Sequence, residues 1–212
     1  MNNNITLDNF SDYIKNIYNV DINVIKPNNY INNKVNSVLG VYLTEKGQEI
    51  EKEMVEYLQQ IFNLYIVEQV PSDNTLYEYP AIKYVELLTK ETNNICLYIH
   101  TKGAGNYHHV QDKIRNFWKH ELTLNLINYI IPLFENYNQP VVTTTFTGSH
   151  KITWFNMFFV NPNVFNNFTV KFDPDRHYYE QMFTNTNVNT IGILRNDINE
   201  ENVNVMFKYF IY

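Results

Sequence analysis

The sequence predicts an α/β fold in which a mostly parallel central sheet is flanked by helices. Three observations support this prediction. Strand and helix patterns alternate from about residue 20 to residue 105 with short connections, as in a βαβαβ unit. The apolar run Ile95–Ile99 is typical of a buried strand and ends in polar residues and glycines. The 212 residues contain no Pro/Gly/Ser-rich linker, so we expect a single domain over 1–212.

The first elements alternate in type. Residues 7–20 carry apolar side chains at helical spacing, while residues 21–25 alternate between polar and apolar and predict a short strand. Residues 37–43 form a stronger apolar strand. From 48 to 65 the apolar positions return to one helical face, with glutamates on the other. Residues 66–70 then predict the next strand, which ends at a Pro-Ser-Asp turn.

The middle of the chain continues this alternation. We expect a helix at 80–89, because its apolar residues share one face and Pro80 suits a first turn. The strand Ile95–Ile99 follows. A longer helix is predicted at 110–129 and is bounded or kinked by Pro132. Beyond it, the β-branched residues of 141–146 predict another strand.

The last third is richer in aromatic residues. Residues 154–160 read as an aromatic strand and residues 168–172 alternate as a strand would, before a short helix at 178–183. Two final strands are expected at 190–194 and 203–210.

Composition narrows the function classes. A formal net charge of -6 and a pI near 5.5 lack the basic field that nucleic-acid binding uses, so we expect no nucleic-acid partner. Cys96 is the one cysteine, which excludes an intrachain disulfide and a cysteine-based zinc site. No leader pattern opens the chain and no segment approaches the roughly 18 apolar residues of a membrane span. We therefore expect a cytoplasmic protein.

The most informative stretch is the end of the central strand. Ile95–Ile99 leads directly into His100, Thr101, Lys102, Gly103 and Gly105. Ligands of parallel α/β sheets bind outside the carboxyl ends of the strands, and a cation beside permissive glycines suits an anionic ligand there. The alternative from spacing alone is that Lys102 is a solvated loop lysine and the glycines form a turn.

Several stretches together resemble the small nucleotide-sugar glycosyltransferases of bacterial capsule clusters and giant viruses. The resemblance covers roughly Tyr77 to Phe183, and its HTKG strand end is the most specific part. The matching stretches are Tyr77–Ile82, Leu97–Gly103, Val110–Asp112 with Arg115, Asn156–Val160 and Arg176–Met182. The chain departs from the family pattern at Phe155, Met157 and Gln181–Phe183, where other aromatic or glycine residues are usual.

The resemblance implies a GT-A-like, Rossmann-type domain. A nucleotide-binding half would occupy about 20–105 and an acceptor-side half about 106–212. The implied activity is transfer of a sugar from a nucleoside-diphosphate sugar, UDP-linked, to a glycan or other hydroxyl acceptor. Donor and acceptor would be its partners, and a homodimer is left open.

The donor assignment follows from the strand end. Many GT-A enzymes bind a divalent metal there through Asp-x-Asp, whereas this chain has Lys102, whose ammonium can neutralise phosphate directly. We therefore expect that no metal is required, with Mn²⁺ or Mg²⁺ as the alternative. The expected donor-binding residues are His100, Thr101, Lys102, Gly103, Gly105, Arg115 and Thr44. Arg115 has a second interpretation, an i, i+3 ion pair with Asp112.

The remaining site residues concern catalysis and the acceptor. Glu180 is the preferred base for the acceptor hydroxyl and Asp112 is its rival. The alternative for each is a carboxylate on the surface of a helix. The expected acceptor-binding residues are Trp154, Asn156 and His150.

Two alternatives accompany this interpretation. Asp173-Pro174-Asp175 is the one literal Asp-x-Asp, but Asp before Pro and ahead of a helix usually forms a turn, so metal binding by Asp173 and Asp175 is the minority interpretation. The whole chain could also be an inactive sugar- or nucleotide-binding protein of the same fold, or a structural protein with an aromatic surface.

Overall fold

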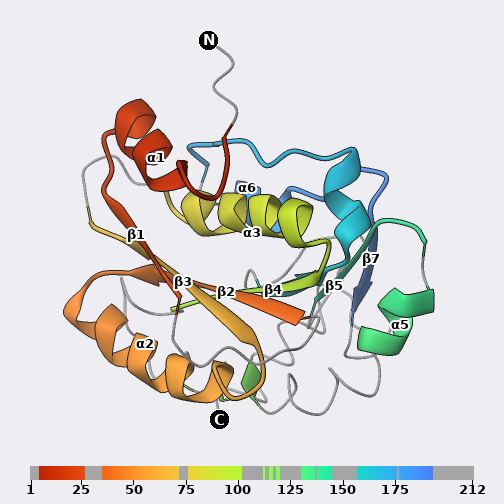
Figure 1. Ribbon diagram of the computed structural model, residues 1–212, viewed down its shortest axis with the longest axis horizontal. Coiled ribbons are helices and arrows are strands. Elements are labelled where there is room, and N and C mark those ends of the chain that lie inside the picture. The colour runs from red at the N-terminus through yellow and green to blue at the C-terminus, as the bar shows by residue number, and fades with distance from the viewer. Residues whose placement is uncertain are drawn as a thin grey trace.

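The protein is an α/β structure built on one seven-stranded mixed sheet with helices on both faces (Figure 1). This computed structural model describes residues 5–26, 35–71, 76–101, 112, 115–116, 118–119, 130–136, 138–144, 157–175 and 177–192. The strands are β1 (Ile22–Ile25), β2 (Val35–Tyr42), β3 (Asn63–Gln69), β4 (Ile95–His100), β5 (Val141–Thr144), β6 (Phe158–Val160) and β7 (Asn189–Gly192). The helices are α1 (Phe10–Tyr18), α2 (Glu45–Leu58), α3 (Tyr79–Thr92), α5 (Ile131–Asn136), α6 (Tyr178–Gln181) and the 3₁₀ helix η3 (Pro162–Asn166).

The prediction of a mostly parallel sheet is wrong. The strand order is β1-β3-β2-β4-β6-β5-β7. The β2–β3, β2–β4 and β5–β7 pairs are parallel, whereas the β1–β3, β4–β6 and β5–β6 pairs are antiparallel. The direction of β6 could not be read from its sequence, because Phe158, Phe159 and Val160 are all buried and an apolar run has the same pattern in either direction.

The predicted βαβαβ unit is confirmed in the order β2-α2-β3-α3-β4, with all three strands parallel. β2 lies between β3 and β4. Its register aligns Gly40 with Val67 on β3 and with His100 on β4. In Figure 1, α1 and α3 lie on one side of the sheet and α2 lies on the other.

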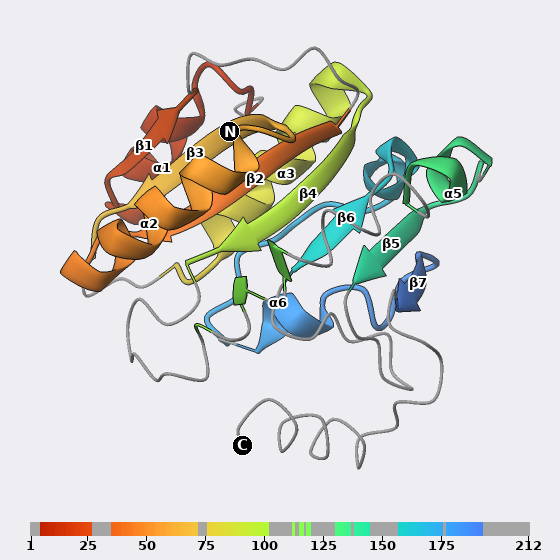
Figure 2. The same cartoon turned by 90° about the horizontal axis from the view of Figure 1, so that it is seen from below.

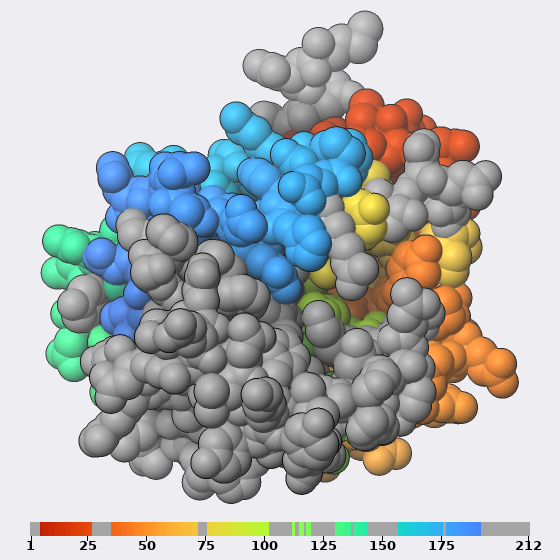
Figure 3. Space-filling view, turned by 180° about the vertical axis from the view of Figure 1, so that it is seen from behind, coloured from red at the N-terminus to blue at the C-terminus, as the bar shows by residue number. Residues whose placement is uncertain are grey.

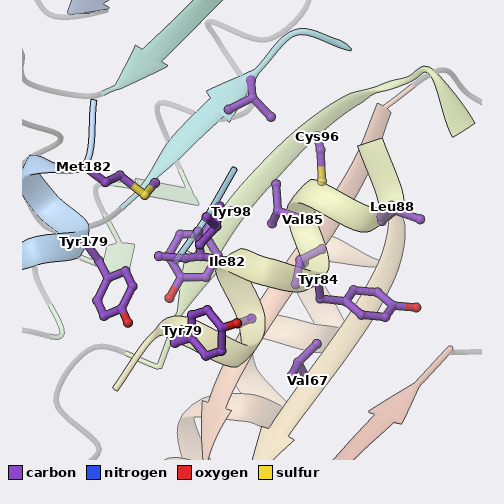
Figure 4. Close-up of a cluster of buried hydrophobic side chains, with 14 of the residues drawn as sticks. Val67, Tyr79, Ile82, Tyr84, Val85, Leu88, Cys96, Tyr98, Tyr179 and Met182 are labelled. Carbon is purple, nitrogen blue, oxygen red and sulfur yellow. The ribbon is translucent and has the colours of Figure 1, made fainter. Parts of the chain in front are cut away.

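The core therefore has two layers. On the α3 side, β2 and β4 contribute Val38, Cys96 and Tyr98 to a large cluster that also includes residues of α1, η3 and α6 (Figure 4). On the α2 side, Leu39 and Leu97 pack with the apolar face of α2 and with Trp118 and Phe134. The alternation of side chains along β2 and β4 assigns successive residues to opposite layers.

Several predicted boundaries differ from the structure. α2 begins at Glu45, three residues before its expected start, because the Oγ1 atom of Thr44 accepts a hydrogen bond from the Gly47 amide at 3.0 Å and caps the helix. α2 then ends at Leu58, so that β3 starts at Asn63. Residues 168–172, expected as a strand, are not in a strand.

Other predictions fall partly or wholly outside the described residues. The expected helix at 110–129 is described only at residues 112, 115–116 and 118–119, which are helical. Its other residues and the expected strand at 203–210 lie outside the described residues. Pro132 occupies the first turn of α5 and so bounds a helix. In the described part of the chain, no helix combines the length and apolar character needed to cross a membrane.

Candidate functional site

The candidate site lies at the sheet edge where β2, β3 and β4 end. The chain leaves β2 for its neighbour β3, and then passes to β4 on the other side of β2. Such a reversal of strand order is the position at which open α/β sheets bind ligands. It places the ends of β2 and β4, and the start of α2, side by side. Figure 2 shows the arrowhead of β4 at this edge with α6 nearby.

In Figure 3, yellow-green atoms, the colour of residues near 100, are visible between light-blue atoms of the C-terminal part and orange atoms of the α2 region. Segments far apart in the sequence therefore border this part of the surface.

Thr101 joins the two central strands beyond the end of their ladder. Its amide donates to the Gly40 carbonyl at 2.9 Å, and its Oγ1 atom accepts from the Tyr42 amide at 3.3 Å. The side chain is buried, with 5% exposure. Thr101 thus fixes the end of β4 against β2, and its predicted contact with the donor stays a prediction.

Thr44 holds the start of α2 against the end of β2. Besides capping the helix through its hydroxyl, Thr44 donates its amide to the Tyr42 carbonyl at 2.8 Å. Gly47 is required here by space, because a Cβ atom on it would lie 1.9 Å from the Tyr42 carbonyl oxygen. The amino terminus of a 14-residue helix is consequently fixed at the edge, where its dipole favours an anion.

His100 is the last residue of β4 and is only half-buried. Its ring centroid lies 6.0 Å from that of Tyr98, in the α3-side core, and 5.9 Å from that of Trp118, in the α2-side core, with Trp118 edge-on. Rings from both layers therefore orient the imidazole. His100 therefore combines partial exposure with an oriented ring, and its contact with the donor stays a prediction.

Arg115 forms the ion pair with Asp112 that the i, i+3 spacing predicts. Its Nε atom also lies 3.9 Å from Oε2 of Glu53 on α2, and the guanidinium is buried. Lys119 pairs with the same Glu53. The segment around Arg115 is thereby attached to α2. The charge of Arg115 is matched by two carboxylates, and its assignment to a donor phosphate stays a prediction, as does that of Asp112 to catalysis.

Glu180 lies on α6, and the aromatic core places that helix. Tyr179 is fully buried in the α3-side cluster with Tyr98, and Phe183, just beyond α6, lies 5.5 Å from Phe158 at the start of β6. Phe158 pairs with Tyr98 in the register of β4 and β6. Glu180 is partly exposed, and its Oε2 atom lies 3.8 Å from Nδ1 of His177. These contacts place α6 beside Tyr98 and Phe158, and the assignment of Glu180 as the base stays a prediction.

Asp173 and Asp175 form a turn. The Oδ1 atom of Asp173 accepts from the Asp175 amide at 2.8 Å, and Oδ1 of Asp175 accepts from the His177 amide at 2.9 Å. These contacts agree with the turn interpretation, although the residue before α6 is His177 and it makes no side-chain cap. Among the described residues, no group of three or more His, Cys, Asp or Glu side chains could hold a metal ion.

Six predicted site residues lie outside the described residues. They are Lys102, Gly103, Gly105, His150, Trp154 and Asn156. Their donor or acceptor assignments stay predictions. By sequence, the first three continue directly from Thr101.

Sequence reasoning missed residues that organise the described part of the site. The ring of Trp118 lies beside that of His100, and the carboxylate of Glu53 on α2 lies beside Arg115, although the members of each pair are distant in the sequence. Tyr77 has a φ of 49°, which is uncommon for a bulky residue, and its side chain is exposed beside the start of α3. No sequence signal marks either contact or this backbone conformation.

The described part of this edge combines the start of α2, which favours an anion, with the oriented imidazole of His100. This combination suits an anionic ligand. Comparisons with protein-family models, with curated proteins and with solved structures gave no match.

Proposed function

We propose that the chain is a glycosyltransferase that uses a nucleoside-diphosphate sugar, UDP-linked, and transfers the sugar to a hydroxyl acceptor. The observation that carries this proposal is the convergence of Thr44, His100 and Thr101 at the reversal of strand order between β2 and β4. The HTKG resemblance adds Lys102 at the next position of the same strand end.

The proposed division of roles follows the two sides of the edge. The amino terminus of α2, His100 and Lys102 hold the diphosphate and stabilise its charge as it leaves. Glu180 accepts the proton of the attacking hydroxyl. Because an ammonium replaces the family's carboxylate pair, transfer proceeds without a divalent metal.

Donor binding and hydrolysis test this proposal. Wild-type protein is incubated with UDP-glucose, UDP-galactose and UDP-N-acetylglucosamine, and released UDP is measured with and without EDTA. We expect release from at least one donor, insensitivity to EDTA, and a loss of at least tenfold in Glu180→Gln. Loss of release in EDTA would refute the metal-free role of Lys102, and full activity of Glu180→Gln would remove Glu180 from the mechanism.

The alternative is a nucleotide-sugar-binding protein without turnover. The ion pair of Asp112 with Arg115 favours it, because one of the two candidate bases is already paired with a cation. A protein that is stabilised by UDP-sugars but releases no UDP would establish this alternative. The outcome is distinct from the absence of any binding, which would refute both functions.

A further inference from the structure

A buried ion pair on α3 is not explained by the proposed chemistry. Glu86 is 2% exposed and Lys83 is 5% exposed, and the Nζ atom of Lys83 lies 2.8 Å from Oε2 of Glu86. Lys90, whose side chain is largely at the surface, donates to the other carboxylate oxygen at 2.5 Å. Charged groups are rarely buried to this extent unless the burial satisfies a specific partner.

That partner is the backbone of Val170. Its amide donates to Oε2 of Glu86 at 2.8 Å, and its carbonyl accepts from Nζ of Lys83 at 3.3 Å. Both polar groups of one distant residue are thus bound by the two members of the ion pair. We call Lys83, Glu86 and the Val170 backbone the Val170 latch.

The latch explains how residues 168–172 are held against α3 without forming a strand. Val170 is 2% exposed, and its amide and carbonyl would be buried without hydrogen bonds if the ion pair were absent. An apolar pair of similar size could fill the space but could not bind either group. The charges therefore specify where this irregular segment lies on α3.

The latched segment leads directly to α6. Val170 is followed by Asp173, whose amide donates to the Tyr179 hydroxyl at 3.0 Å, and Tyr179 precedes Glu180. The segment is thus held at two points, at Val170 by the latch and at Asp173 by α6 itself. Both described ion pairs of Glu86 lie within α3, so the two hydrogen bonds to Val170 make the polar connection of the latch to this segment.

We propose that Lys83 and Glu86 are positioning residues that set the location of Glu180 at the sheet edge through the Val170 latch. This inference rests on the proposed function, because Glu180 is the base of that reaction. The latch acts on the acceptor side of the site, whereas Thr44, His100 and Thr101, which we assign to the donor, are held by β2, β4 and α2.

The central variant removes the charges but keeps the volume. Lys83→Met combined with Glu86→Leu fills the core while leaving both polar groups of Val170 unbonded. We expect this double variant to bind UDP, measured by calorimetry, with a Kd within twofold of wild type, and to release UDP from the donor sugar at least tenfold more slowly. The matched control is Lys90→Ala, which leaves the Val170 contacts intact and is expected to behave like wild type.

Hydrogen exchange gives a readout that needs neither turnover nor a stable variant. In wild-type protein, we expect the Val170 amide to exchange as slowly as amides in the middle of α3, and exchange at the rate of an exposed loop would overturn the latch. If the double variant binds UDP and releases UDP from the donor at the wild-type rate, the positioning role is overturned, whereas the proposed function still holds. If wild-type protein binds no nucleotide or releases no UDP, the glycosyltransferase proposal and this positioning role fall together, and slow exchange at Val170 then establishes only a structural latch.

Discussion

Replacement of Gly47 by alanine tests how tightly the start of α2 is fixed against the donor edge. Two effects oppose each other. Alanine stabilises a helix by about 1 kcal/mol relative to glycine. The new Cβ atom, however, would lie 1.9 Å from the Tyr42 carbonyl oxygen and 3.2 Å from Oγ1 of Thr44. The closer contact is with backbone, so that no side-chain rotation can relieve it.

The clash should exceed the gain in helix propensity. Overpacking costs about 1–3 kcal/mol, and a backbone contact this short belongs at the upper end, which leaves a net loss of about 2 kcal/mol. For a chain of this size, that corresponds to a fall in Tm of about 4–8 °C. Thermal unfolding followed by circular dichroism measures it, with the exposed Gln48→Ala as the matched control expected to unfold at or above the wild-type temperature. A Gly47→Ala protein at least as stable as Gln48→Ala would refute the close approach of α2 to β2.

Three further predictions concern the cap and the buried ionisable groups. Thr44→Ala should lower the free energy of unfolding by about 1 kcal/mol through loss of the helix cap, and the hydroxyl of Thr44→Ser should keep most of that stability. Equal urea midpoints for the wild type and both variants would contradict the cap. Burial raises the pKa of the Cys96 thiol, and the sulfur points toward α3 between Val85 and Leu88 (Figure 4). Iodoacetamide should therefore label the native protein far more slowly than the urea-unfolded chain. Equal labelling rates would contradict the burial of Cys96. Burial also raises the pKa of the Tyr98 phenol, so the unfolded chain ionises first on alkaline titration. The contribution of Cys96 and Tyr98 to stability should be fully present below the ordinary thiol pKa of about 8.5 and should decline above it, and a Tm that does not fall between about pH 8.5 and 11 would contradict this sign.

The elements that the sequence predicted well are those with one strong period. β2 and β4 are mostly apolar runs, and the expected helix at 80–89 lies within α3, with Pro80 in its first turn, although α3 is buried nearly all round rather than on one face. The βαβαβ order followed from them, and with it the location of His100 and Thr101 at the sheet edge. Topological rules were sufficient here because short connections leave few alternatives.

What the sequence could not supply depends on contacts between distant residues. The direction of β6 required knowledge of its neighbours, since its residues are buried on both faces. The alternation of apolar and polar residues at 168–172 resembles a strand, but the segment is held through the hydrogen bonds of Val170 with Lys83 and Glu86. Lys83, Glu86 and Lys90 have i, i+3 and i, i+4 spacing, a pattern that usually marks a solvated helix face.

The same limit applies to the site. The Asp112–Arg115 pair could be predicted because its partners share one helical turn, whereas the approach of Glu53 from α2 could not. The acceptor residues Trp154, Asn156 and His150 rest on sequence alone. The donor edge is therefore the better-founded half of the proposed site.

The most direct test of the proposed function is the binding of a UDP-sugar to the edge formed by β2, β4 and α2. The protein is unfolded thermally with the three UDP-sugars named above, with and without EDTA, beside His100→Ala and Lys102→Met. We predict that at least one donor raises the wild-type Tm, by about 5–11 °C at a concentration of about one hundred times Kd. We also predict that EDTA leaves the rise unchanged and that both variants reduce it. A wild-type Tm that none of the donors changes would contradict the proposal.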